Sequence, residues 1–159
     1  MGRLRPEPRR VVPVYMDIER AWQTLHEAEL VHDEAAVHAA VERLAGEISQ
    51  ALAAHNPLVL CVMGGSVVFT GHLLTRLRFP LEFDYLHVTR YDGTTRGGAL
   101  SWKVLPRQPV AGRAVLVLDD ILDEGTTMAA IRERLLADGA QSVAIAVLAD
   151  KATGRRKPV

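Results

Sequence analysis

Hydrophobic residues recur at two different periods along the chain, and the change of period separates the predicted elements. From Asp33 to about Ala54 they fall at three- and four-residue steps, which predicts an amphipathic helix. Four short apolar runs follow, each bounded by turn-forming residues, and predict strands. These runs are Leu58 to Met63, Leu81 to Val88, Ala114 to Leu118 and Val143 to Leu148.

Helical spacing lies between these runs. Val67 to Leu77 separates the first strand from the second, and Thr127 to Leu136 separates the third from the fourth. Strands that alternate with helices favour a parallel sheet. The predicted fold class is therefore α/β, a mostly parallel sheet flanked by helices.

The stretch from Arg90 to Pro109 interrupts the alternation. Asp92 to Gly98 has turn chemistry and little to bury, so we predict a flexible loop there. A short hairpin strand around Leu100 to Val104 is expected to follow it.

Length, composition and charge narrow the possibilities further. A chain of 159 residues is long enough for one sizeable core, which predicts a single domain over 1–159, with 1–14 as an Arg- and Pro-rich tail. Nineteen basic residues balance nineteen acidic ones, which argues against nucleic acid or a membrane as partner. The single cysteine, Cys61, lies in an apolar run, and no apolar stretch of signal-peptide or membrane-spanning length is present, so we expect a cytoplasmic protein.

Paired carboxylates follow the third predicted strand. Asp119 and Asp120 come directly after an apolar run, where the carboxyl end of a strand in an open α/β sheet binds ligands. Adjacent carboxylates are poor partners for a phosphate, but they accept hydrogen bonds from a diol or hold a hydrated Mg²⁺. This pair therefore predicts a sugar site.

A Gly-Thr-Thr turn follows the carboxylates and opens the next predicted helix. Gly125 allows the backbone to approach a phosphate closely, and a helix N-terminus favours negative charge. Thr126 and Thr127 add hydroxyl donors. Together with the carboxylates, this turn predicts a sugar phosphate as ligand.

Two other interpretations of the acidic segment are weaker. Acidic residues and threonines also solvate loops and cap helices, but a cap needs one such residue rather than the whole set. A phospho-acceptor receiver domain also has paired aspartates after a strand, but that pair follows the first strand of its fold, and too few residues remain here after Asp119. The chain has neither a P-loop pattern nor Gly-x-Gly-x-x-Gly after a strand.

The segment resembles the phosphoribosyl pyrophosphate signature of the type I phosphoribosyltransferases, in which two acidic residues after a strand precede Asp-x-Gly-x-Thr. The resemblance is to the purine, hypoxanthine-guanine branch, and it extends from about Val31 to Lys151. It implies that Asp119 and Asp120 hold the ribose hydroxyls and Mg²⁺, and that Asp123 is the general base near N7 of the purine. It also implies a cradle for the 5′-phosphate formed by Asp123, Glu124, Gly125, Thr126 and Thr127.

Three further segments match the same branch. Gly64 and Gly65 occupy the place of the pyrophosphate-binding loop, where Gly64 replaces a lysine of many relatives; a plain strand-to-helix turn is the alternative. Tyr91 matches the tyrosine of the flexible loop that closes over the site, and Arg90 stands in place of the preceding serine. Arg90 or Arg96 is a candidate for pyrophosphate contact, although surface arginines are common.

Lys151 matches the lysine that donates to the 6-oxo group of hypoxanthine or guanine. Without the resemblance it would be interpreted as a solvated side chain. Relatives continue beyond this lysine with an aromatic residue that stacks on the purine, so the resemblance implies that a C-terminal base-binding segment is missing from 1–159.

The expected function is transfer of phosphoribosyl from phosphoribosyl pyrophosphate to a 6-oxopurine in purine salvage, with Mg²⁺ as cofactor, by a homodimer or homotetramer. The preference among hypoxanthine, guanine and xanthine stays open. The alternative is a regulatory protein that senses phosphoribosyl pyrophosphate without transferring it. Some relatives of that kind bind RNA, and the neutral charge balance argues against such a role.

Overall fold

The computed structural model describes residues 17–90, 100–152 and 154–159, apart from the side chain of Arg90. The chain divides into two compact units after Asp33. The first contains α1 (Ile18–Glu27), which has no buried residue and was not predicted from the sequence. Within α1 the rings of Trp22 and His26 stack with centroids 5.8 Å apart.

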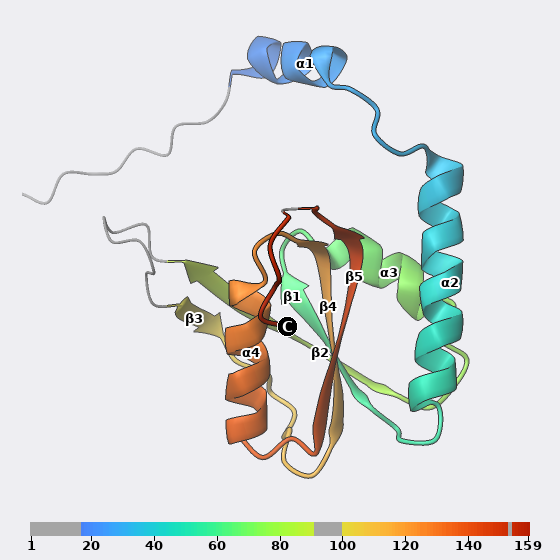
Figure 1. The fold of residues 1–159 in the computed structure, drawn as a ribbon, viewed down its shortest axis with the longest axis vertical. Coiled ribbons are helices and arrows are strands. Elements are labelled where there is room, and N and C mark those ends of the chain that lie inside the picture. Colours follow the sequence, from blue (N-terminus) through green and yellow to red (C-terminus); the bar gives the residue numbers. More distant parts are fainter. Residues whose placement is uncertain (1–16, 91–99, 153) are drawn as a thin grey trace, which may run out of the picture. The chain divides into compact units, whose positions relative to one another are not determined.

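The second unit, Glu34–Val159, is built on a five-stranded sheet with the strand order β3-β2-β1-β4-β5 (Figure 1). β1 is parallel to β2 and β4, β4 is parallel to β5, and β3 is the antiparallel edge strand. The strands are β1 (Leu58–Met63), β2 (Glu82–Arg90), β3 (Leu100–Val104), β4 (Ala114–Leu122) and β5 (Ser142–Asp150). This arrangement confirms the predicted mostly parallel α/β fold.

Helices cover both faces of the sheet (Figure 1). On one face, α2 (Glu34–Leu52) and α3 (Val67–Leu74) pack on a core that includes Val41, Phe69 and Leu73. On the other face, α4 (Thr126–Ala137) contributes Met128, Ile131 and Leu135. β1 in the centre of the sheet is buried from Leu58 to Val62, because both of its faces are covered.

The predicted boundaries differ from the structure mainly at β4. This strand continues four residues past the predicted end at Leu118, so Asp119 and Asp120 lie within it. The added residues of β4 pair with β5, with Asp119 opposite Val147 and Leu122 opposite Asp150. Pairing with a neighbouring strand therefore outweighs the low strand propensity of aspartate.

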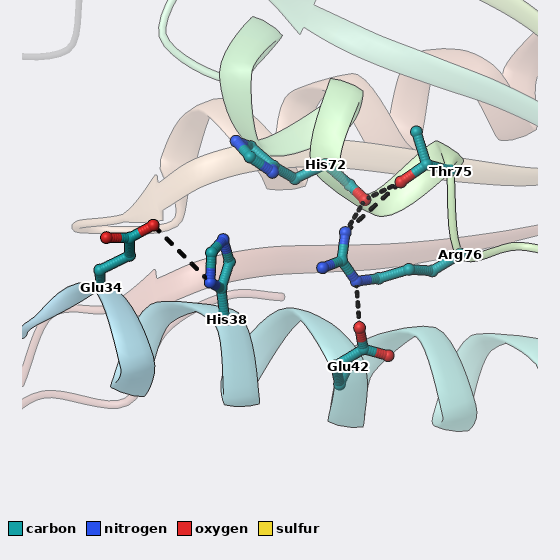
Figure 2. Close-up of polar contacts among 6 residues, drawn as sticks. All are labelled: Glu34, His38, Glu42, His72, Thr75 and Arg76. Carbon is teal, nitrogen blue, oxygen red and sulfur yellow. Dashed lines mark hydrogen bonds and ion pairs between the residues drawn. The ribbon is translucent and has the colours of Figure 1, made fainter.

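Polar contacts join α2 to α3 at their exposed edge, as Figure 2 shows. Arg76 donates from Nε to Glu42 Oε1 at 2.5 Å and from a terminal nitrogen to the His72 carbonyl at 2.7 Å. His38 lies between Glu34, at 4.0 Å, and the ring of His72, whose centroid is 5.8 Å away. These contacts hold α2 and α3 together on the face of the sheet that both helices cover.

A buried carboxylate anchors the connection between β3 and β4. Asp84 on β2 is 8% exposed and accepts hydrogen bonds from the amides of Tyr85, Arg107 and Gln108 at 2.8, 2.5 and 2.9 Å. Burial alone would raise the pKa of Asp84, but the three amide hydrogen bonds outweigh it and hold the pKa below the ordinary 3.8. The negative charge of Asp84 is thus balanced by the backbone.

Candidate active site

The carboxyl ends of β1, β4 and β5, three of the four parallel strands, bring most of the predicted site residues to one edge of the sheet. Gly64 and Gly65 follow β1, Asp123 to Gly125 follow β4, and Lys151 follows β5. Because neighbouring parallel strands end at the same edge, the topology alone assembles residues that are far apart in the sequence.

The paired carboxylates are half-buried near the end of β4. The amide of Asp120 donates to Asp119 Oδ1 at 3.0 Å, and the amide of Ile121 donates to Asp120 Oδ1 at 2.9 Å. Burial raises the pKa of Asp119 to about 6; the adjacent Asp120 adds to the increase, and the Asp120 amide opposes it. The pair therefore carries negative charge that the backbone balances only in part.

The loop after β1 lies against this pair. A Cβ atom added to Gly65 would lie 2.9 Å from the carboxyl carbon of Asp120, so any larger residue there would displace this carboxylate. The peptide bond between Met63 and Gly64 is cis. Ser66, fully buried, closes the loop by donating from Oγ to the Val62 carbonyl at 2.5 Å.

The loop after β4 ends at the start of α4. Gly125 has a φ of +78°, a left-handed conformation that glycine adopts without strain, and it directly precedes the first turn of the helix. Its carbonyl accepts from the amide of Ala129 at 2.9 Å. The positive end of the α4 dipole and the amides of its first turn therefore face the loop, as an anion site requires.

A second charged pair closes one side of the site. Lys151 Nζ lies 3.3 Å from Asp123 Oδ1, and both side chains are more than half exposed. The amide of Lys151 donates to the Leu122 carbonyl at 3.1 Å, which ties the end of β5 to the end of β4. A hydrogen-bond donor and a carboxylate thus meet beside the paired aspartates.

The remaining predicted residues lie on the loop after β4, at the start of α4, or outside the described residues. Glu124 lies in the exposed loop after β4, and Thr126 and Thr127 begin α4. Tyr91 and Arg96 lie outside the described residues, so their predicted roles stay predictions.

Sequence reasoning missed a lysine that contacts this site. Lys157 Nζ donates to the carbonyls of Leu122 and Lys151 at 2.6 and 2.7 Å and forms an ion pair with Asp150. The only local signal was the basic run Arg155 to Lys157, which does not indicate which of its members folds inward.

Metal ligands are sparse in this region. Across the ranges that the structure describes, no group of three or more His, Cys, Asp and Glu side chains could hold a metal ion. Two adjacent carboxylates suit Mg²⁺, which keeps several waters and takes its other ligands from substrate phosphates.

Comparison with known proteins decides the family. The model of the phosphoribosyl transferase domain matches residues 27–159. The chain belongs to this phosphoribosyltransferase family. Its membership confirms the resemblance inferred from the acidic segment.

Relatives of this phosphoribosyltransferase include two purine enzymes. A hypoxanthine-guanine-xanthine phosphoribosyltransferase of Tritrichomonas foetus is 31% identical over 144 residues, 91% of this chain and 74% of the relative. A hypoxanthine-guanine phosphoribosyltransferase of Streptococcus pneumoniae is 33% identical over 125 residues, 78% of this chain and 68% of the relative.

Solved structures agree with the fold. The hypoxanthine phosphoribosyltransferase of Trypanosoma cruzi, in complex with the product IMP, superposes with a TM-score of 0.69 at 28% identity, covering 77% of this chain and 71% of that one. A Staphylococcus aureus structure gives a TM-score of 0.78 at 24% identity, covering 86% and 76% of the two chains.

As for membranes, the described helices include none with the length and apolar character of a membrane span.

Proposed function

We propose that this phosphoribosyltransferase moves the phosphoribosyl group of phosphoribosyl pyrophosphate to N9 of a 6-oxopurine, hypoxanthine or guanine. The bond between the anomeric carbon and the pyrophosphate oxygen breaks, the bond to N9 forms, and the purine loses a proton. IMP or GMP and pyrophosphate are the products, as purine salvage requires. The observation that carries the proposal is the approach of Lys151 to Asp123 beside the paired aspartates.

The acidic pair would bind the ribose. Asp119 and Asp120 would accept hydrogen bonds from the two ribose hydroxyls, and as adjacent carboxylates they would also suit a hydrated Mg²⁺. When bound, Mg²⁺ neutralises charge on the leaving group. The high pKa of Asp119 supports this role, because a partly balanced carboxylate gains from a cation.

The two loops would hold the phosphates. Glu124, Gly125, Thr126 and Thr127 surround the N-terminus of α4, which suits the 5′-phosphate. Gly64 and Gly65 would present backbone amides to the pyrophosphate beside Asp120. The ribosyl group is then fixed between two anchored ends, and much of the rate gain is positional.

The charged pair would bind the base. Lys151 donates to the 6-oxo group, while Asp123 accepts or shares the proton at N7 as N9 attacks. Replacing Asp123 with Asn is expected to lower turnover by roughly 10²-fold or more while changing the dissociation constant of phosphoribosyl pyrophosphate much less. Equal losses in turnover and binding would contradict a base role.

Substrate specificity tests the whole proposal. Nucleotide formation from phosphoribosyl pyrophosphate and Mg²⁺ should occur with hypoxanthine or guanine and not with adenine, whose 6-amino group would face Lys151 as a second donor. Xanthine as a fourth base tests the 2-position. Binding of phosphoribosyl pyrophosphate without nucleotide formation would overturn the transferase and favour the regulatory alternative.

The proposal extends to location and assembly. We place the reaction in the cytoplasm, where a reducing environment fits the single cysteine, Cys61, which is buried and free. We also propose a homodimer or homotetramer. Light scattering on the purified protein measures that assembly, and a monomeric mass would contradict it.

A further inference from the structure

One lysine near the C-terminus of the chain folds back onto the sheet. The Lys157 side chain is 12% exposed, although the residues before it, Arg155 and Arg156, are exposed. Its ammonium group lies at the ends of β4 and β5, where it donates to the Leu122 and Lys151 carbonyls and pairs with Asp150. The position is unusual for lysine, which is rarely buried unless it is paired.

These contacts use the full capacity of the group. An ammonium has three N–H donors, and Lys157 has three acceptors: two carbonyls and one carboxylate. Removing one partner of a buried charge leaves the other without compensation, which makes such contacts costly to break. The three hydrogen bonds of the Lys157 ammonium therefore fix the position of the Lys157 side chain.

The contacts fix the backbone of Lys151 from both sides. The Lys151 amide donates to the Leu122 carbonyl at 3.1 Å, and the Lys151 carbonyl accepts from Lys157 at 2.7 Å. The Leu122 carbonyl also accepts from Lys157, so one ammonium joins both strand ends. The Lys151 side chain extends from this fixed backbone to Asp123, 3.3 Å away.

We propose that Lys157 is a positioning residue that sets the place of the Lys151 ammonium in the base-binding part of the site. The inference rests on the proposed function, because it assigns Lys157 a task in binding the 6-oxopurine. Lys157 itself donates to protein atoms and acts on the base only through Lys151.

A second contact provides a rival role that the experiment can separate. A Cβ atom at Gly125 would lie 3.1 Å from Lys157 Cβ and 3.2 Å from Pro158 Cδ, so this segment also covers the phosphate loop. If Lys157 acted mainly on that loop, its removal would weaken binding of phosphoribosyl pyrophosphate. If Lys157 acts through Lys151, its removal would weaken binding of the purine.

Steady-state kinetics on the full chain distinguish these roles. Lys157→Met is expected to raise the KM for hypoxanthine roughly tenfold and to leave the KM for phosphoribosyl pyrophosphate within about twofold, since misplacing one donor affects one substrate. Asp150→Asn should raise the hypoxanthine KM in the same direction by less, and it serves as the test if Lys157→Met does not fold. Arg132→Met, which removes an exposed charge on α4, is the matched control and should change neither constant.

A double variant gives the decisive readout. In a Lys151→Met background, Lys157→Met should raise the hypoxanthine KM by less than about twofold, because the residue through which it acts is gone. A full tenfold effect in that background, or an equal rise in the KM for phosphoribosyl pyrophosphate, would overturn the inference. So would an unchanged hypoxanthine KM in both Lys157→Met and Asp150→Asn. Failure of the proposed function differs from these results, because the unmodified protein would then form no nucleotide at all.

Discussion

Two aspartates, on the strands that flank β1 on either side, differ in how their charge is balanced. Asp84 on β2 accepts three backbone amides, and its pKa lies below 3.8. Asp119 on β4 accepts a hydrogen bond from the Asp120 amide. Burial raises the pKa of Asp119 to about 6, and the adjacent Asp120 carboxylate adds to the increase. A carboxylate whose charge is balanced by backbone hydrogen bonds stabilises the fold. A carboxylate whose charge is balanced only in part is a candidate for binding a ligand.

Removing the unbalanced carboxylate should have the largest effect on function. Asp119→Asn is expected to lower the kcat/KM of phosphoribosyl transfer roughly 10²-fold or more, because the ribose and the Mg²⁺ lose an anionic partner. The melting temperature should stay the same or rise, since repulsion from Asp120 is relieved. A stability loss without a kinetic loss would reverse the assignment of the two aspartates.

Removing the balanced carboxylate should do the opposite. Asp84→Asn is expected to lower the free energy of unfolding by about 1–3 kcal/mol, because an amide group cannot accept all three hydrogen bonds. Denaturant titration measures the loss, and turnover per folded molecule should be retained. Activity falling as far as in Asp119→Asn, with stability unchanged, would contradict a structural role.

The same carboxylate predicts an acid-dependent loss of stability. Because the pKa of Asp84 is lowered in the folded state, its contribution is present above about pH 3.8 and is lost as pH falls through the folded-state value. Asp84→Asn should therefore differ from the unmodified protein at pH 7 and converge with it at the acid end of a denaturation series. A difference that is constant with pH would contradict this account.

A smaller effect is expected at the glycine beside the acidic pair. Gly65→Ala places a Cβ atom 2.9 Å from the carboxyl carbon of Asp120, so the carboxylate must shift. We expect a roughly tenfold loss in kcat/KM from that displacement. Gly46→Ala in α2 is the control, because a Cβ there meets nothing within 4 Å; it should leave kinetics unchanged, and equal losses in both variants would contradict the steric argument.

The sequence predicted the regular parts of the fold well, for a physical reason. Alternation of apolar runs with helical spacing predicted β1, β2, β4 and β5 and the helices α2, α3 and α4, because each buries one face or both against the core. The edge strand β3 was predicted separately, as a short hairpin strand after the loop. α1 was missed because the prediction relied on patterns that bury a core, and this helix has no buried residue. Its apolar residues Ile18, Trp22 and Leu25 do recur at helical spacing, so a signal was present.

From the residues alone, the candidate site could be predicted where its members follow one another in the chain, whereas Gly64, Gly65 and Lys151 were predicted through the family resemblance. Asp119 to Thr127 form one continuous segment with a recognisable order of acids, glycine and threonines. The extension of β4 through Asp119 and Asp120 depends on pairing with β5, which propensity does not indicate. Lys157 contacts Leu122, and Asp84 accepts from the amides of Arg107 and Gln108. These contacts join residues that are distant in the sequence, so only the fold shows them.

Titration of the aspartate carboxyls by NMR, with and without phosphoribosyl pyrophosphate and Mg²⁺, tests the central comparison most directly. Asp119 should titrate at about 6 in the free protein and well below that value with both ligands bound, while Asp84 should stay below 3.8 in both states. The Asp119→Asn variant assigns the signal. An Asp119 pKa near 3.8 in the free protein, or one that the ligands leave unchanged, would contradict the assignment of the acidic pair as the ribose and magnesium site.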